Sequence, residues 1–322
     1  MGDRDASLNI LFVCRGNKAY VISPIIKAQA ESLEAAGQKV TIYPLEGKGR
    51  LLYFKNILRL KEFIRKGNYD IVHAHYGFSG ITCTLAASRK RLVVSLMGSE
   101  MYRSVLMRKV YRIFSGLLWA RTIIKTEAMA RLLRSPGSEI IPNGVNLDLF
   151  HPIDKLTARQ RLGLNSANQI LLFPSYTFRK EKNYQFIKRV VEERFSNTQL
   201  LNFDADPPEI INLKYNAADV VVMASLFEGS PNAIKEAMAC NRPIVATDVG
   251  DISIIISDTP GCFISELNES DYEKKINQAI AFSRSGGSTT GRERIARLNL
   301  DSVSVANRLI SLYKQVISLK GV

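Results

Sequence analysis

The chain has 322 residues, of which 46% are hydrophobic and 23% charged, and this balance excludes a disordered, collagen-like or disulfide-built protein. Its 44 lysines and arginines against 30 acidic residues give a net charge of +14. No apolar stretch reaches the roughly 18 residues of a membrane span, and the first residues lack a signal-peptide profile. Four widely spaced cysteines without a CxxC pair indicate neither a zinc site nor a disulfide framework, so we expect a reduced, cytoplasmic protein.

Continuous apolar runs alternate with amphipathic stretches in the first half of the chain. The predicted strands are residues 8–13, 39–43, 70–73 and 92–96. A helix over 23–36 separates the first two, and Gly37 suits its end because glycine enters the left-handed region without strain. Apolar strands separated by amphipathic helices predict a parallel sheet that is covered on both faces.

The second half repeats this pattern after a connector at 141–152, which holds two prolines and Gly144. The predicted strands are 170–173, 220–224 and 243–246, and the predicted helices are 183–194, 231–240 and 270–284. Two doubly wound, Rossmann-like α/β domains are therefore expected. Because open α/β sheets bind ligands at the carboxyl ends of their strands, we expect a ligand site between the domains.

Residues 218–251 are the most informative segment, and they predict a strand, a loop, a helix and a second strand. Ser230 suits the N-cap of the helix and Pro231 its first residue. Amides of the loop and of the helix start form an anion site. Glu228 and Glu236 can both face a ligand there, and a carboxylate can hold adjacent sugar hydroxyls. The segment predicts a bound phosphate with hydroxylated rings beside it.

The same segment resembles glycosyltransferase family 4, whose members are retaining enzymes of the GT-B fold. The family has two glutamates separated by seven residues, and this chain reads EGSPNAIKEAMACNRPIVATDVG over 228–250. The connector is similar to the family's IPNGVD-x-x-x-F, with Asn146 in place of Asp, and DIVHAH over 70–75 also fits. A bare pair of glutamates at this spacing is usually a solvated helix face, but the surrounding sequence favours a binding role.

The resemblance covers about residues 8 to 315 and implies a domain assignment. Residues 1–152, with a returning C-terminal helix over about 303–322, would bind the acceptor. Residues 153–302 would bind a nucleotide-sugar donor. The two domains would face an interdomain cleft.

The resemblance also implies roles for individual residues. Glu236 would hold the nucleotide ribose, while Glu228 would hold the donor sugar. Arg179 and Lys182 would grip the diphosphate and stabilise its charge as it leaves; Lys180 competes with Arg179, and a merely charged helix start is the alternative. The implied donor-binding set is Gly16, Gly229, Ser230, Pro231, Asn232 and Glu236.

The first domain contributes weaker candidates. Gly16 stands in loop 14–20, where the family has a glycine-rich loop, although a plain turn glycine is an equal alternative. Many family members carry a histidine where this chain has Met97, and Glu100 stands in the family's acidic position. With Glu100, His75 and Asn143 are the acceptor-side or cleft candidates. A lone histidine such as His75 is more often structural.

Neither a metal nor a cofactor is expected. The spacing Asp204-Ala205-Asp206 is typical of metal sites in other sugar transferases, but here it lies in a proline-rich loop and is interpreted as a chance match.

The positive charge is concentrated in residues 1–150, whose 23 basic and 11 acidic side chains give +12. Segments 48–66 and 103–125 supply most of it and predict basic amphipathic helices. Such helices suit an anionic membrane surface, although a solvated basic face is the alternative. Nucleic acid is disfavoured because no nucleic-acid motif accompanies the charge.

The sequence is interpreted as a retaining, metal-independent glycosyltransferase that moves a sugar from a nucleotide-sugar donor to a saccharide or lipid-linked acceptor. We expect it in the cytoplasm, peripheral on the inner face of the membrane, in cell-surface polysaccharide assembly. The alternatives are a GT-B epimerase or phosphorylase and, because of Met97, a non-catalytic subunit that binds nucleotide sugars.

Overall fold

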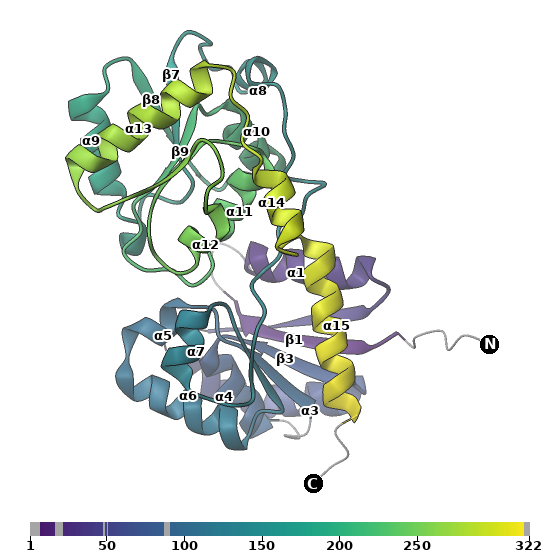
Figure 1. The fold of residues 1–322 in the computed structure, drawn as a ribbon. Helices are drawn as coiled ribbons and strands as arrows, with labels where there is room; N and C mark the ends of the chain where they lie inside the picture. The colour runs from purple at the N-terminus through teal and green to yellow at the C-terminus, as the bar shows by residue number, and fades with distance from the viewer. Residues whose placement is uncertain (1–6, 17–21, 48, 50, 87–90, 319–322) are drawn as a thin grey trace. The chain divides into compact units, whose positions relative to one another are not determined.

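The computed structural model describes residues 7–16, 22–47, 49, 51–86 and 91–318. The chain divides into two compact units, Met1–Gly144 with Ser302–Val322 and Val145–Asp301, and each contains a parallel β-sheet with helices on both faces (Figure 1). The α/β fold class is confirmed. The first unit ends inside the expected connector but before residue 152, because Val145 already bonds to the second unit: its amide donates to the Leu300 carbonyl at 2.9 Å.

The sheet of the first unit has the strand order β2-β1-β3-β4-β5-β6. Its strands are β1 (Asn9–Arg15), β2 (Lys39–Leu45), β3 (Ile71–His75), β4 (Leu92–Ser95), β5 (Arg121–Ile124) and β6 (Ser138–Ile140). All neighbours run parallel, with Ile10 opposite Val40 on one side and Ile71 on the other. Strands β5 and β6 were not predicted.

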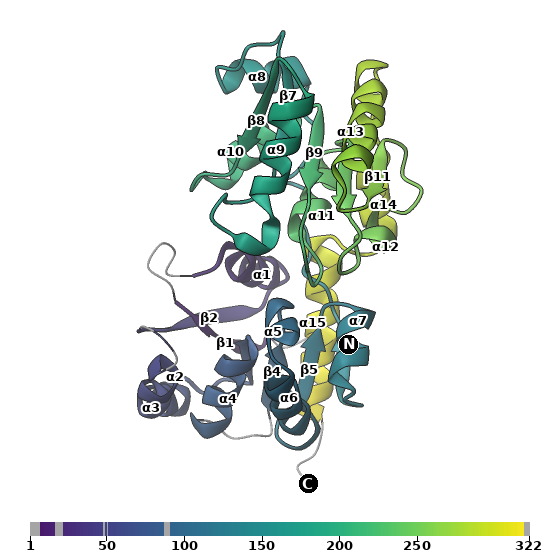
Figure 2. The ribbon, with the colours of Figure 1, turned by 90° about the vertical axis from the view of Figure 1, so that its left-hand side faces the viewer.

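The helices of the first unit form two layers, one on each face of the sheet (Figure 2). One layer contains α1 (Pro24–Ala35) and α15 (Ser302–Ser318), which pack on Ile10 and Phe12. The other packs on Leu11 and Val13, because successive strand residues point to opposite faces. Its helices are α2 (Leu51–Lys55), α3 (Ile57–Gly67), α4 (Gly77–Ala86), α5 (Ser99–Arg103), α6 (Val105–Leu117) and α7 (Glu127–Leu133).

The two predicted basic helices differ in detail from the structure. Segment 51–66 is not one helix but two, α2 and α3, which meet at Asn56. The Asn56 side chain donates to the Glu46 and Leu52 carbonyls, and such bonds compete with helix continuation. In segment 103–125, only α6 is a basic amphipathic helix of more than two turns. Trp119 belongs to the core, where its indole N–H donates to Thr84 Oγ1 at 3.0 Å.

The sheet of the second unit has the strand order β11-β10-β9-β7-β8, and all neighbours are parallel. Its strands are β7 (Gln169–Phe173), β8 (Thr198–Asn202), β9 (Val220–Met223), β10 (Ile244–Thr247) and β11 (Cys262–Ser265). One face is covered by α9 (Tyr184–Arg194) and α13 (Glu269–Arg284). The other is covered by α10 (Pro208–Ala217), α11 (Asn232–Ala239), α12 (Ile252–Ile256) and α14 (Gly291–Arg297). Helix α8 (Lys155–Arg161) packs on α10.

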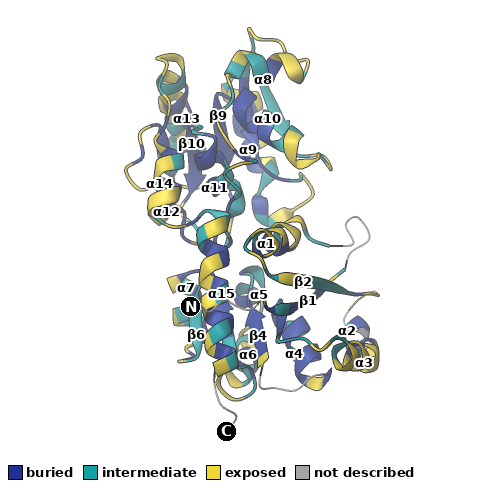
Figure 3. Cartoon of the chain, turned by 90° about the vertical axis from the view of Figure 1, so that its right-hand side faces the viewer, coloured by how far each residue is buried: buried dark blue, intermediate teal, exposed yellow. Residues whose placement is uncertain are grey.

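Burial follows this layering, with the central strands buried and the outer helix faces exposed (Figure 3). The last helix, α15, is tied to the first sheet by a buried hydrogen bond of 2.7 Å between Tyr313 and His73. Among the helices in the described part of the chain, none combines the length and hydropathy that a membrane crossing requires.

Candidate functional site

Two neighbouring strands of the second unit, β7 and β9, end at the same edge of the sheet. From β7 the chain winds outward to β8 and then crosses back to β9 on the other side. Ligands of open α/β sheets bind outside the carboxyl ends of the strands at such a reversal. The segments after these two strands, 174–183 and 224–231, carry the three predicted catalytic residues and half of the predicted donor-binding set.

An ion pair and a backbone hydrogen bond join these two segments. Lys182 ends the short 3-10 helix η2 (Lys180–Lys182), and its ammonium pairs with the Glu228 carboxylate. Beside this pair, the Leu226 amide donates to the Glu181 carbonyl at 2.9 Å. The two charged side chains are only 8% and 13% exposed, so they attract each other more strongly than a surface pair does. The structure brings two of the predicted catalytic residues into contact.

Arg179 lies differently from the expectation. Its side chain is exposed, and its guanidinium pairs with the Glu181 carboxylate at 2.8 Å. Lys180, the expected competitor, is also exposed. The predicted cationic pair of Arg179 and Lys182 is therefore divided, because each cation has a carboxylate partner of its own.

Helix α11 begins one residue later than predicted. Pro231 occupies the N-cap position, where Ser230 was expected, because its backbone is extended with ψ 121°. Within the described residues, no side chain caps the first turn, and its amide groups are thus suited to an anion. Two buried oxygens, Asn232 Oδ1 and Ser225 Oγ, also find no hydrogen-bond partner there. Buried polar atoms are normally paired, so these two suit contact with a ligand.

Glu236 lies in the second turn of α11 and is held by a tyrosine from α10. The Tyr215 hydroxyl donates to Glu236 Oε2 at 2.8 Å. Burial raises the pKa of Glu236, while the Tyr215 hydrogen bond and the charges of Lys235 and Lys182 oppose that rise. A carboxylate fixed in this way is oriented to accept hydrogen bonds from a diol.

Two charged residues at this site were missed by the sequence analysis, Lys235 and Asp251. Lys235 is fully buried, and burial lowers its pKa to about 8, against the opposing charges of Asp251 and Glu236. Burial likewise raises the pKa of Asp251, and the charge of Lys235 opposes the rise. One signal in the sequence could have indicated that Lys235 is buried. Lys235 follows Ile234 and lies within one turn of Met238, on a helix face that is otherwise apolar.

Gly250 fixes the backbone next to Gly229. Its φ is +70°, and a Cβ atom built on it would lie 2.0 Å from the Gly229 carbonyl oxygen. A side chain at this position is therefore excluded both by conformation and by contact. Gly229 itself is buried, so the loop before α11 is held against the segment after β10.

Two first-unit candidates have defined backbone partners. Glu100 Oε2 accepts from the Gly77 amide at 2.6 Å, and Oε1 accepts from the Met97 amide at 2.7 Å. Burial raises the pKa of Glu100 to about 7. The amide of Gly16 donates to the Leu45 carbonyl at 3.1 Å, so this amide is hydrogen-bonded within the first sheet rather than open to a ligand. Most of the predicted glycine loop, residues 17–20, lies outside the described residues.

His75 and Asn143, the other acceptor-side candidates, are both buried. The His75 ring stacks on His73 with centroids 4.4 Å apart and meets the edge of Phe12 at 4.6 Å. Burial lowers the pKa of His75 to about 3, so the ring is neutral. Neither buried ring nitrogen of His75 has a hydrogen-bond partner among the described residues, and its assignment to the acceptor side stays a prediction.

The Asp204–Asp206 loop is held by protein contacts. Asp206 Oδ2 accepts from Lys214 at 2.6 Å and from the Asp204 amide at 2.9 Å. Within the described ranges, no group of three or more His, Cys, Asp or Glu side chains is arranged to hold a metal ion.

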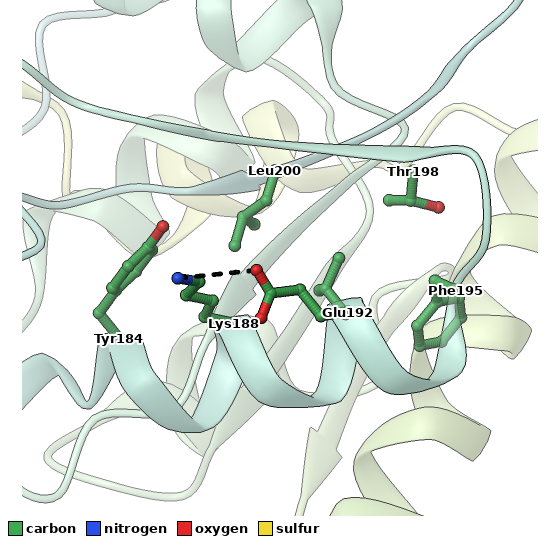
Figure 4. A pocket seen from close by; sticks show the side chains of 7 residues that line it. Tyr184, Lys188, Glu192, Phe195, Thr198 and Leu200 are labelled. Atoms are coloured by element: carbon green, nitrogen blue, oxygen red, sulfur yellow. Dashed lines mark ion pairs between the residues drawn. The ribbon is translucent and has the colours of Figure 1, made fainter.

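A small pocket on the second unit does not coincide with the predicted site. It lies between α9 and β8, and the Lys188–Glu192 ion pair of 3.6 Å crosses it (Figure 4). Tyr184, Phe195 and Leu200 also line it. None of its lining residues belongs to the segments after β7 and β9.

Two family models match the chain, one in each half. The model described as "Glycosyltransferase Family 4" matches residues 12–149, and "Glycosyl transferases group 1" matches residues 179–281. The second match contains Lys182, Glu228 and Glu236.

Curated relatives are about one-quarter identical to the chain. The UDP-Gal:alpha-D-GlcNAc-diphosphoundecaprenol alpha-1,3-galactosyltransferase of Escherichia coli is 25% identical over 67% of this chain and 67% of its own length. The D-inositol 3-phosphate glycosyltransferase of Mycobacteroides abscessus is 25% identical over 81% of this chain and 69% of its own.

Solved structures share the fold over nearly the whole chain. Sucrose-phosphate synthase from Thermosynechococcus elongatus superposes with a TM-score of 0.78 at 17% identity, covering 97% of this chain and 100% of that one. The Anabaena protein HepE, solved in complex with UDP-glucose, gives a TM-score of 0.71 at 16% identity over 96% of this chain and 100% of that one. These similarities extend to both units and confirm the two-sheet architecture.

Proposed function

The chain belongs to glycosyltransferase family 4, and from this premise we propose that it transfers a sugar from a nucleotide-sugar donor to a saccharide or lipid-linked acceptor, with retention of configuration. One observation carries the proposal. Lys182, Glu228 and Glu236 gather around the uncapped start of α11, at the carboxyl ends of β7 and β9. Cation, helix dipole and carboxylates are the groups that a sugar diphosphate requires.

The diphosphate is assigned to the start of α11 and to Lys182. The amides of the first helical turn and the positive end of the helix dipole attract an anion, and the Lys182 ammonium adds a full charge. Glu228 keeps this ammonium in place before the donor arrives. Glu228 is then placed to accept hydrogen bonds from hydroxyls of the donor sugar.

The nucleoside end of the donor is assigned to Glu236. Two adjacent ribose hydroxyls can donate to one carboxylate, and the Tyr215 hydroxyl fixes the orientation of that carboxylate. Burial raises the pKa of Glu236, and the positive charges of Lys235 and Lys182 oppose that rise.

In the proposed reaction, the bond between the sugar carbon and the leaving diphosphate oxygen breaks. An acceptor hydroxyl forms the new bond on the same face of the sugar, and its proton passes to the leaving diphosphate. Negative charge accumulates on that leaving group, beside Lys182 and the α11 amides, which stabilise it electrostatically. We propose that these groups of the chain perform this role without a metal or a separate cofactor.

The acceptor is assigned to the first unit and to the membrane surface. The E. coli relative is named for a diphosphoundecaprenol-linked substrate, which supports a lipid-linked acceptor for this chain. Glu100 fixes the loop after β4 against the start of α4 and so shapes the sheet edge of this unit. We place the protein in the cytoplasm, peripheral on the inner face of the membrane, in polysaccharide assembly.

A thermal-shift screen with UDP, GDP, ADP and their common sugar conjugates tests the donor site. A ligand that binds the folded state raises the Tm, by an amount that follows its affinity. We expect one nucleotide series to stabilise the wild-type chain and to lose that effect in Glu236→Ala. Equal stabilisation of the variant would contradict the ribose assignment.

Transfer itself is tested with the stabilising donor and a membrane extract as acceptor. The expected product carries the sugar in the donor's anomeric configuration, which NMR of the released glycan measures. An altered donor sugar or free sugar phosphate would instead indicate an epimerase or a phosphorylase. Nucleotide binding without turnover would favour a non-catalytic subunit, the alternative that Met97 raises.

A further inference from the structure

Helix α6 exposes a stripe of large apolar side chains. Leu106, Ile113 and Leu117 are 70%, 56% and 78% exposed. At 3.6 residues per turn these positions fall within about 40° of one another around the helix. Tyr111 and Ser115, which lie on a different side, are buried in the core and fix the orientation of the helix. The stripe therefore faces solvent as a continuous line.

Helices α2, α3 and α4 add to this exposed apolar surface. Leu58 on α3 and Phe54 on α2 are 79% and 64% exposed, and Leu85 on α4 is also exposed. In a monomeric soluble protein, single exposed apolar residues are ordinary, but a contiguous group indicates an interaction site.

The helices that carry these residues form one layer. A chain of aromatic rings connects them: Tyr53 on α2 stacks on Phe78 of α4 at 5.3 Å, and Phe78 meets Tyr111 of α6 at 6.4 Å. Figures 1 and 2 show α3, α4 and α6 side by side on the same face of the first sheet. The exposed apolar residues thus lie on adjacent helices of one layer.

Positive charge surrounds this surface. One basic residue lies on α2, four lie on α3 and three lie on α6, and all but Arg108 are exposed. The three helices contain one acidic residue, Glu62, which pairs with Lys66 at 2.8 Å. Figure 3 shows the outer face of α3 as exposed. A surface that combines apolar side chains with unbalanced cations matches the interface of an anionic bilayer.

We propose that this surface docks the first unit onto an anionic lipid bilayer, with Phe54, Leu58, Leu106, Ile113 and Leu117 entering the interface and the lysines and arginines of α2 and α3, with Lys109 of α6, contacting the headgroups. We call these residues the docking face. The inference deepens the proposed function by assigning its membrane partner to a surface. It is tested by binding without donor, so its failure leaves sugar transfer untouched.

The apolar part of the docking face is tested with the full chain and vesicles that contain phosphatidylglycerol. Replacing Leu106, Ile113 and Leu117 by Gln should weaken vesicle binding by about 100-fold or more, because three apolar side chains no longer leave water. The matched control replaces Leu156 and Ile254 by Gln. They are similarly exposed but belong to the second unit, and binding should not change.

The charged part is tested by reversing Arg59 and Lys109 to Glu. Each basic side chain near an anionic surface contributes about fivefold to affinity, so binding should fall at least roughly 30-fold. The control reverses Arg161 and Lys274, which are exposed on the second unit and change the net charge equally. Wild type and all variants should bind only weakly to vesicles of phosphatidylcholine alone.

Three results would overturn the proposal. The first is that wild type and both docking-face variants bind vesicles equally, and the second is that neutral and anionic vesicles are bound equally. The third is that wild type is a dimer that does not bind vesicles, while the variant with Leu106, Ile113 and Leu117 replaced is a monomer. The last would assign the surface to a second copy of the chain. An unchanged Tm and nucleotide response of each variant verifies that it is folded.

Discussion

Lys182 and Glu228 form a mostly buried ion pair between the segments that follow β7 and β9, 46 residues apart in the chain. Each charge is the partner that makes burial of the other tolerable, since an unpaired buried charge is costly. The pair also positions a cation at the helix start where we place the diphosphate. Stability and function therefore depend on the same contact, and variants can separate them.

Replacing either member of this pair should destabilise the protein, and replacing both should cost less than the two single losses added together. We expect Lys182→Met and Glu228→Gln each to lower the free energy of unfolding by about 2–4 kcal/mol, because each leaves the other polar group without its partner, and the double variant to lose less than the sum. Urea denaturation measures these values. Transfer should fall by roughly 100-fold or more in all three, without rescue in the double variant.

An exposed pair in the same unit is the control. Arg189 and Glu269 lie 2.6 Å apart, and their side chains are 55% and 31% exposed, far more than those of Lys182 and Glu228, so Arg189→Met and Glu269→Gln should change stability by less than about 1 kcal/mol. If the double variant of Lys182 and Glu228 recovers transfer, the two residues are a structural pair and the assignment of Lys182 to the diphosphate is wrong.

The family resemblance predicted that Lys182 and Glu228 share a donor site, but the sequence did not predict that the two side chains pair. It could not predict Tyr215 as the partner of Glu236, because that contact depends on how α10 packs against α11. Lys235 was missed for a related reason: a lysine on a short helix is usually solvated, and only the packed α11 shows it buried near Asp251. Local pattern predicts elements, while their packing decides which polar groups meet.

Removing the Tyr215 hydroxyl should weaken donor binding with little change in packing. In Tyr215→Phe the Glu236 carboxylate loses a hydrogen bond of 2.8 Å, and we expect about 10-fold lower affinity for the nucleotide. Calorimetric titration measures it. Tyr272→Phe is the matched control, because Tyr272 is buried in the same unit but its hydroxyl donates to the Val245 carbonyl.

The same variant should change the pH dependence of donor binding. The Tyr215 hydrogen bond lowers the pKa of Glu236 against the rise caused by burial, so its removal raises that pKa further. Protonated Glu236 accepts ribose hydrogen bonds poorly, and the acid-side loss of affinity should begin at a higher pH in Tyr215→Phe than in wild type. An identical pH profile would separate Glu236 from nucleotide recognition.

Gly250→Ala should disturb the donor loop. The new methyl group meets the Gly229 carbonyl oxygen and the backbone keeps a positive φ, so we expect a loss of more than about 2 kcal/mol in stability and weaker nucleotide binding. Gly163→Ala is the control. Gly163 has a φ of +65° and no atom within 4 Å of the added carbon, so it should cost only about 1 kcal/mol. Nucleotide affinity should change in the first variant alone, as measured by thermal shift.

Two buried groups of the first unit should give opposite pH dependences of stability. His75 has a folded pKa of about 3, below its usual 6.5, so the unfolded chain binds the extra proton between these values. The contribution of the neutral His75 ring to the free energy of unfolding is therefore fully present above pH 6.5. It is lost as the pH falls toward 3, at up to about 1.4 kcal/mol per pH unit. Glu100 has a folded pKa of about 7, above its usual 4.5, so its burial costs stability as the pH rises from 4.5 to 7.

Comparing each variant with wild type isolates these contributions, because other titrating groups cancel in the difference. The stability advantage of wild type over His75→Leu should grow as the pH rises from 3 to 6.5. Its advantage over Glu100→Gln should shrink between pH 4.5 and 7, since the variant keeps a neutral side chain while Glu100 ionises. Urea denaturation at half-unit pH steps measures both differences. Parallel slopes for the two variants would contradict a neutral buried His75 beside a carboxyl group that titrates near neutrality.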